Sequence, residues 1–159
     1  MLFRSQIFGD HPLVMIACPS HPLAQKRNIA KEDLVEEHFL VREKGSGTRS
    51  SLDIFMRDVT GWNERDHEEM ASNETIKQAV MAGMGIAFIS AHTIAMELEL
   101  KRLAILDVTG MPIRRQWYAV SRSDRSLSPA MTAFNTFLVN DGARHLPFIP
   151  TIYPVGRGA

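Results

Sequence analysis

This chain of 159 residues has a single cysteine, a formal net charge of zero and no long apolar run. Cys18 is the only cysteine, so no internal disulfide forms and a reducing compartment is favoured. The 18 basic residues balance the 18 acidic ones, which argues against nucleic-acid binding by bulk positive charge. No apolar run approaches the ~20 residues that cross a membrane, and residues 1–10 show no signal peptide. We therefore expect a cytoplasmic protein without membrane contact.

Patterns for catalysis and metal binding are also missing. The six histidines are scattered, and zinc is disfavoured without a cysteine pair. Gly45-Ser46-Gly47 lacks the glycine spacing of a nucleophile elbow. Gly83-Met84-Gly85 begins like a dinucleotide fingerprint, but Phe88 stands at the third glycine position, so these glycines are expected to end a helix. We expect no enzyme, no catalytic residue, no metal and no cofactor.

Strands and helices alternate along most of the chain, which is typical of an α/β domain with a largely parallel sheet. Apolar runs predict strands at residues 13–17, 39–41, 67–71, 86–89, 103–106 and 116–120. Helical periodicity and caps predict helices at residues 30–37 with Asn28 as cap, 49–58 ended by Gly61, 72–83, 92–101 with Glu97 outward, and 128–142. Residues 62–66 are expected to form a polar loop.

A glycine-rich turn, Lys44-Gly45-Ser46-Gly47-Thr48-Arg49, joins a predicted strand to the next helix. The first N–H groups of a helix lack intrahelical acceptors, and the macrodipole favours an anion there. Ser46 and Thr48 add hydroxyls, and Arg49 adds a cation. Ser72-Asn73-Glu74 begins another helix after a strand, and ligands collect outside the carboxyl ends of such strands. This predicts a pocket for a carboxylate or phosphate. The alternative interpretation of the turn is an ordinary helix cap with two flexible glycines.

Several segments together point to one family. They are residues 10–16, 20–24, 39–43, 45–49, 72–77, 80, 82–87, 115–118, 127–130, 134, 137 and 138. In combination they resemble the LysR-type transcriptional regulators, and the resemblance covers most of the chain up to about residue 140. The amino-acid sequence of residues 72–90 and 112–120 most resembles the subgroup that regulates carbon-dioxide-fixation (Calvin cycle) operons.

The resemblance implies a fold like the type 2 periplasmic binding proteins, with one complete lobe (regulatory subdomain II) and a remnant of the other. Residues 1–18 are then expected to be a crossing strand and first-lobe remnant, and residues 19–107 the second effector-binding lobe. Residues 108–140 are expected to be a returning strand and C-terminal helix, and residues 141–159 a flexible tail. The family's helix-turn-helix is expected to be absent, so DNA is contacted only by an intact parent protein.

By resemblance, the chain is the effector-sensing domain of a regulator and binds a small anionic metabolite (phosphosugar, nucleotide or carboxylate) in an interlobe cleft. The matching site residues are Ser46, Gly47, Thr48, Arg49, Ser72, Asn73 and Glu74. The helix at residues 128–139 is expected to expose Phe134 and Phe137 and to favour a homo-oligomer. A solute-binding protein and an enzyme of the same fold stay as alternatives, because fold alone does not decide function.

Overall fold

The computed structural model describes residues 2–62 and 67–152, and the chain divides into two compact units. Unit 1 comprises Met1–Pro12 and Arg114–Ala159, and unit 2 comprises Leu13–Ile113. These boundaries differ from the expected ones at residues 18 and 107. The reason is strand β1 (Phe3–Ala17), which is one continuous strand that contributes residues to both units.

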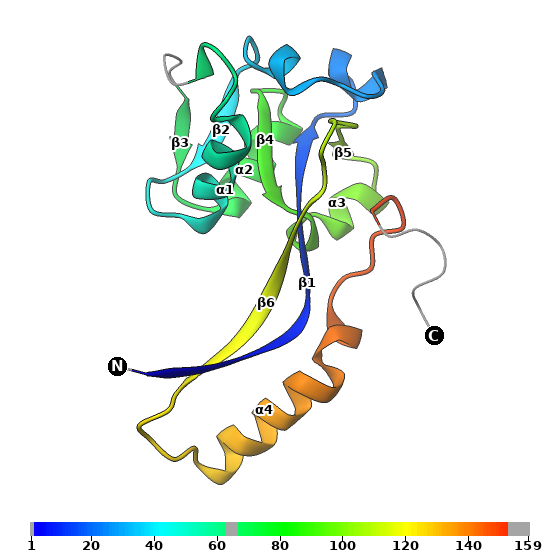
Figure 1. Ribbon diagram of the computed structural model, residues 1–159. Helices are drawn as coiled ribbons and strands as arrows, with labels where there is room; N and C mark the ends of the chain where they lie inside the picture. The colour runs from blue at the N-terminus through cyan, green and yellow to red at the C-terminus, as the bar shows by residue number, and fades with distance from the viewer. Residues whose placement is uncertain (1, 63–66, 153–159) are drawn as a thin grey trace. The chain divides into compact units, whose positions relative to one another are not determined.

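Unit 2 is built on a mixed sheet with the strand order β3-β2-β4-β1-β5 (Figure 1). Its other elements are β2 (Phe39–Arg42), β3 (Glu68–Met70), β4 (Ile86–Ser90), β5 (Ala104–Ile105), α1 (Gly47–Met56), α2 (Asn73–Met81), α3 (Ala95–Glu99) and the 3₁₀ turns η1 (Pro22–Gln25), η2 (Lys31–Leu34) and η4 (Ala91–Thr93). Strand β2 is parallel to both β3 and β4, whereas β1 is antiparallel to β4 and β5. The prediction of a largely parallel sheet is therefore right only for β2, β3 and β4.

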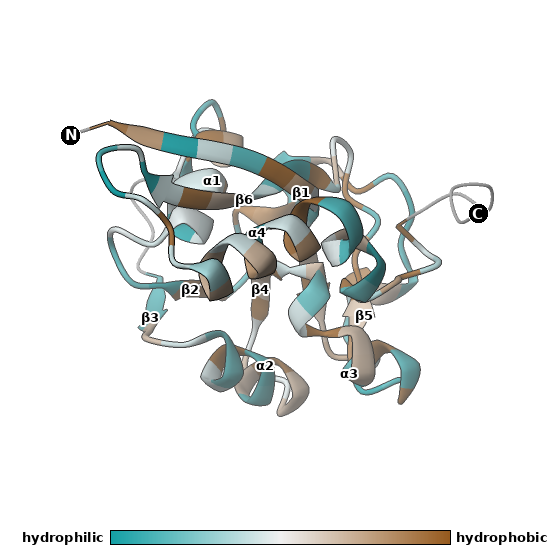
Figure 2. Ribbon diagram, turned by 90° about the horizontal axis from the view of Figure 1, so that it is seen from below, coloured by the Kyte–Doolittle hydropathy of each residue, from teal (hydrophilic) through white to brown (hydrophobic). Residues whose placement is uncertain are grey.

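Helices cover both faces of this sheet. Successive strand residues point to opposite faces, and Met15 and Phe88 belong to one buried cluster with Leu52 and Met56 of α1. Helix α2 contacts β2 and β4 and buries Val80. Figure 2 shows α1 on one side of β2 and β4, and α2 and α3 on the other.

Three predicted helices are wrong in extent. The helix expected at residues 30–37 is only the 3₁₀ turn η2, and its cap residue is Ala30, without a side-chain cap. Asn28 does not cap it, because Asn28 has a φ of 49° and its N–H donates to Asp107 at 3.2 Å. Helix α1 already ends at Met56, before Gly61. The helix expected at residues 92–101 divides into η4 and the five-residue α3.

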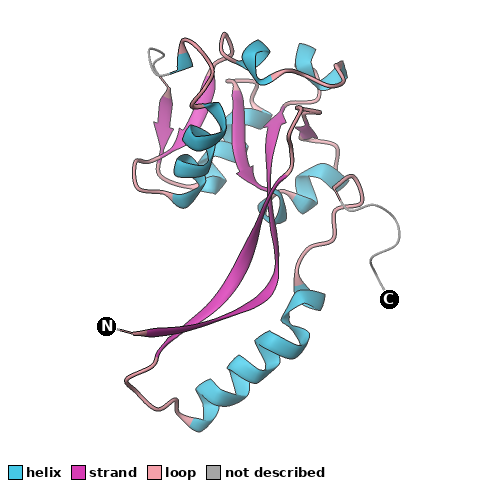
Figure 3. Cartoon of the chain, viewed as in Figure 1, coloured by secondary structure: helices cyan, strands magenta, loops and turns pink. Residues whose placement is uncertain are grey.

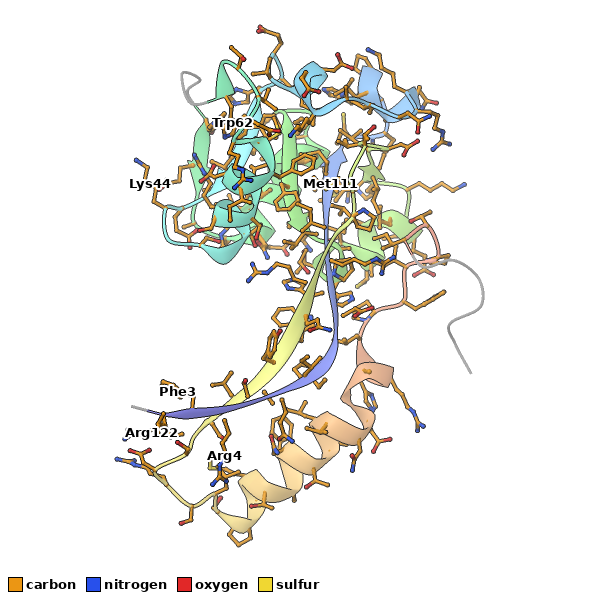
Figure 4. All side chains as sticks on the ribbon, viewed as in Figure 1. Phe3, Arg4, Lys44, Trp62, Met111 and Arg122 are labelled. Carbon is orange, nitrogen blue, oxygen red and sulfur yellow. The ribbon has the colours of Figure 1, made fainter. Side chains whose placement is uncertain are left out.

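Trp62 was predicted to lie in a polar loop and is instead a core residue, while residues 63–66 lie outside the described residues. Its side chain, labelled in Figure 4, is 2% exposed. It packs edge-on to Phe39, with ring centroids 4.9 Å apart. The ring of His67 also contacts Trp62, with ring centroids 4.1 Å apart. The large apolar area of the indole ring favours its burial, even though its neighbours in the sequence are polar.

Unit 1 is a two-stranded ribbon with one long helix beside it (Figure 3). Strand β6 (Ile113–Arg122) pairs with β1, and the N–H of Ser123 donates to Leu2 C=O at 3.1 Å. Helix α4 (Pro129–Asp141) begins as predicted, since Ser128 caps it through the N–H of Met131. The 3₁₀ turn η5 (Gly142–His145) follows. Asn135 of α4 donates to the side chain of Gln6 at 2.8 Å, which fastens the helix to β1.

The end of unit 1 differs from the flexible tail expected at residues 141–159. Ile149 and Ile152 are buried, and η5 is regular. Residues 153–159 lie outside the described residues.

We predict that Trp62→Ala lowers the free energy of unfolding by about 3–5 kcal/mol, because it leaves a cavity beside Phe39. Urea denaturation followed by circular dichroism measures this loss. The matched control is Ile54→Ala on α1, whose side chain is 64% exposed, and we expect it to change stability by less than about 0.5 kcal/mol. Equal losses in the two variants would contradict a core role for Trp62.

Candidate functional site

The carboxyl ends of β2, β3 and β4 lie at one edge of the sheet of unit 2 (Figure 1). Arg42, the last residue of β2, pairs with Met70, the last residue of β3. On the other side of β2, Leu40 pairs with Ala87 of β4, and the same register brings the residue after Arg42 level with Ser90. We call this place, where the chain leaves β2 and β4, the β2–β4 edge.

The connections that leave the β2–β4 edge go to opposite faces of the sheet. Strand β2 leads through the glycine-rich turn to α1, and β4 leads through η4 to α3. Helix α3 lies beside α2 on the face opposite α1, because Lys77 of α2 donates to Glu97 of α3 at 2.7 Å. The prediction that Glu97 faces outward is therefore wrong. In open α/β sheets, such a switch between adjacent strands leaves a crevice in which ligands bind.

Helix α1 begins at this edge with two of the predicted hydroxyls. Ser46 is the N-cap residue and makes no side-chain capping hydrogen bond, while its C=O accepts from the N–H of Ser50 at 3.0 Å. Thr48 shares a helical face with Leu52 and Met56, since these positions are four residues apart. Thr48 therefore lies on the side of α1 that packs on the sheet, at the end nearest the β2–β4 edge.

Two predicted charges are occupied by partners within their own helices. The Nε of Arg49 donates to both carboxylate oxygens of Asp53, at 3.0 and 3.1 Å. Glu74 pairs with Lys77 at 2.9 Å and accepts from Gln78 at 3.1 Å. These hydrogen bonds from Lys77 and Gln78 lower the pKa of Glu74. Arg49 is thus not the unpaired cation that its place in the turn suggested.

Ser72 and Asn73 serve the start of α2. The hydroxyl of Ser72 accepts from the N–H of Thr75 at 3.1 Å, which is the predicted capping bond. The side-chain oxygen of Asn73 accepts from Arg42 at 2.8 Å. The predicted residues on α2 therefore stabilise the start of that helix.

Arg42 is a structural centre of this edge and was not among the predicted site residues. Its guanidinium donates to both carboxylate oxygens of Glu43, at 2.7 and 2.8 Å, as well as to Asn73. The hydrogen bond with Glu43 raises the pKa of Arg42, and the same bond lowers the pKa of Glu43. Arg42 thereby joins the turn before α1 to the first residue of α2. The available signal was an Arg-Glu pair directly before the glycine-rich turn.

Lys77 is the one charged side chain among the described residues that is almost fully buried. Burial lowers its pKa, but hydrogen bonds to Glu97 and Glu74 outweigh that effect, so the pKa is raised and the ammonium stays charged. This triad joins α2 to α3.

A separate cavity of about 420 Å³ lies beside the other end of α1 and holds none of the predicted site residues. Its lining residues are Ala30, Lys31, Glu32, Phe55, Thr109 and Gly110. Lys31 there pairs with Asp58, and its ammonium lies 5.6 Å from the centre of the Phe55 ring.

Within residues 2–62 and 67–152, no three histidine, cysteine, aspartate or glutamate side chains are grouped to hold a metal ion. Over the same residues, no helix has the length and apolar character needed to traverse a lipid bilayer.

Comparison with known proteins identifies the family to which the chain is similar. Residues 2–143 match the family described as LysR substrate binding domain. The chain is 60% identical over 151 residues to the HTH-type transcriptional regulator CbbR of Sinorhizobium medicae, covering 95% of this chain and 48% of that protein. It is 48% identical over 141 residues to the RuBisCO operon transcriptional regulator of Allochromatium vinosum, covering 89% of this chain and 46% of that protein. The chain thus spans about half the length of these relatives.

A solved structure with the same fold is the regulatory domain of CcmR from Synechocystis PCC6803 in complex with 2-PG. It has a TM-score of 0.76 and 39% identity, and the match covers 86% of this chain and 65% of that chain. This likeness confirms the predicted fold class. These relatives are regulators, and the similarity to carbon-dioxide-fixation regulators is confirmed, so the solute-binding alternative is not favoured.

We predict that the Arg42–Glu43 pair makes stability depend on pH. Because the pKa of Glu43 is lowered in the folded chain, its stabilising effect is present above the unfolded pKa of about 4.5 and is lost as pH falls through the folded value. In Glu43→Gln, we expect a lower urea midpoint than in the unchanged chain at neutral pH, and a smaller difference below about pH 4.

The control for this measurement is Glu32→Gln, an exposed carboxylate of η2. A difference between Glu43→Gln and the unchanged chain that does not shrink in acid would show that the ion pair is not its source.

Proposed function

We propose that this chain, which belongs to the LysR substrate-binding domain family, is the effector-sensing part of a transcriptional regulator and binds a small anion at the β2–β4 edge. The anion is a metabolite that carries phosphate or carboxylate, such as a phosphosugar, a nucleotide or an organic acid. Ser46, Gly47 and Thr48 are its proposed main contacts, with Arg49, Ser72, Asn73 and Glu74 around them.

One observation carries this proposal: helix α1, ten residues long, begins at the switch between β2 and β4. Helix N-termini bind anions through backbone N–H groups and the macrodipole. The similar CcmR regulatory domain was solved in complex with 2-PG, which supports a small ligand in this fold. Arg49 and Arg42 are bound to carboxylates, so in this proposal backbone N–H groups and hydroxyls give selectivity.

The signal in this proposal is a change in the population of domain conformations. A ligand shifts such an equilibrium only by its difference in affinity for the two states. In the intact regulator, a helix-turn-helix domain then contacts operator DNA in the cytoplasm, and the relatives' names favour carbon-dioxide-fixation operons as targets. The chain catalyses no reaction in this account, since the relatives that it resembles are named as regulators.

The same proposal includes a homo-oligomer formed through unit 1. Phe134 and Phe137 of α4 are 60% and 43% exposed, and their rings stack with centroids 6.4 Å apart. Tyr118 and Val120 of β6 are also largely exposed. Exposed apolar side chains of this number favour association between copies.

We predict that 2-PG at about 100 times its Kd stabilises the chain by about 2.7 kcal/mol, as a ligand that binds only the folded state does. Differential scanning fluorimetry measures the rise in Tm. Thr48→Val, which removes a hydroxyl and keeps the side-chain shape, should abolish most of the rise. Thr60→Val, beyond the other end of α1, should keep it.

Fructose bisphosphate, ATP and citrate, each compared with sulfate at equal ionic strength, distinguish the three classes of anion. The proposed function is wrong if no anion raises the Tm of the unchanged chain above the sulfate control.

We also predict that the chain is oligomeric at about 100 µM by light scattering, and that Phe134→Glu with Phe137→Glu makes it monomeric, because two buried carboxylates oppose association. Met96→Glu is the matched control, since Met96 is a 71% exposed side chain of unit 2. The interface is excluded if the unchanged chain is monomeric at this concentration, or if the double variant stays oligomeric.

A further inference from the structure

We propose that Ser90 is a direct ligand contact at the β2–β4 edge and that its hydroxyl is satisfied only when the effector is bound. The inference rests on the proposed function and adds a binding residue that the glycine-rich turn does not reveal. It starts from one unusual atom in the interior of unit 2.

The hydroxyl of Ser90 is buried without a hydrogen-bond partner among the described residues. The residue is 4% exposed, and its Oγ has neither a donor nor an acceptor partner. The nearby Thr93 hydroxyl donates to the backbone C=O of Ser90 at 2.7 Å and not to the Ser90 side chain. A buried hydroxyl without a partner is costly, and a hydrogen-bond partner from outside the chain would offset that cost.

The position of Ser90 directs this hydroxyl to the proposed site. Ser90 is the last residue of β4, so it lies at the carboxyl end of the strand, opposite Leu13 of β1. Because side chains alternate along a strand, Ser90 shares its face with Phe88. Phe88 belongs to the core cluster that includes Leu52 of α1, so Ser90 points to the face that α1 covers.

The hydroxyls of Thr48 and Ser90 therefore both face the layer between α1 and the sheet, and both lie at the end of that layer where α1 begins. Thr48 is the first-turn residue on the sheet-facing side of α1, and Ser90 ends the strand beneath that helix. Between them the chain switches from one face of the sheet to the other, and ligands of open α/β sheets bind at such switch points. An anion at the N-terminus of α1 thus has a second hydroxyl donor available from β4.

Burial of the Ser90 hydroxyl also gives the site two states. In the structure the hydroxyl is covered, so a ligand reaches it only after a small movement at the end of β4. Binding exchanges an unsatisfied hydroxyl for a charge-assisted hydrogen bond, which is stronger than a neutral one. The ligand-bound state thus has a hydrogen bond to Ser90 that the ligand-free state lacks. A ligand shifts a conformational equilibrium through such a difference in interaction free energy.

The test is Ser90→Ala in the 159-residue chain, with 2-PG as the probe in isothermal titration calorimetry. We expect the Kd to rise roughly tenfold or more, as for the loss of a hydrogen bond to a charged group. Urea denaturation of the ligand-free variant should show stability equal to or above that of the unchanged chain, because no hydrogen bond is lost. A structural role for Ser90 predicts the opposite change in stability.

Two further variants sharpen the test. Ser90→Thr keeps the hydroxyl and should retain more affinity than Ser90→Ala. Ser20→Ala removes an exposed hydroxyl just after the end of β1, at the opposite edge of the sheet, and should leave the Kd unchanged.

The outcomes separate this inference from the proposed function. If the unchanged chain binds 2-PG and Ser90→Ala binds it equally well, the role of Ser90 is wrong and the site at α1 stands. If Ser90→Ala loses affinity and folding stability together, Ser90 is structural and the inference is likewise wrong. If the unchanged chain binds neither 2-PG nor the other anions, both proposals fail.

Discussion

Parallel pairing of β2 with both β3 and β4 is the constraint on which the candidate site depends. Because the three strands point the same way, the segments that follow them emerge at one edge of the sheet. The glycine-rich turn, the start of α2 and the end of β4 lie there, although they belong to three separate stretches of the sequence. An antiparallel β2 would send the turn to the opposite edge, and the start of α1 would have no counterpart from β4.

The charges at this edge are arranged to hold the loops in place. Arg42 is shared between Glu43 and Asn73, Arg49 binds Asp53, and Lys77 binds Glu97 across two helices. Because the charges of these pairs are satisfied within the chain, their main effect is to orient the loops and helices that they join. An anion at α1 would then meet backbone dipoles at the start of the helix whose orientation is set before the ligand arrives.

Unit 1 shows the opposite situation, in which the elements form but leave large apolar side chains exposed. A two-stranded ribbon with one helix is too small to bury both of its apolar faces. Helix α4 is well capped by Ser128, yet none of its residues is buried. Phe134 and Phe137 were expected to be exposed from the sequence and are exposed. Their exposure follows from the small number of elements around α4, and for that reason our proposal places the contact between copies on this unit.

The sequence by itself determined the strands of unit 2, the caps at Ser72 and Ser128 and the turn before α1, because these depend on residues a few positions apart. It also led to the family. Only the tertiary structure decided that Trp62 is buried, that Glu97 holds Lys77 and that Arg42 reaches Asn73, since each contact joins segments distant in sequence. Ser90 is the clearest case: a serine that ends an apolar strand carries no local signal, and only burial without a partner distinguishes it.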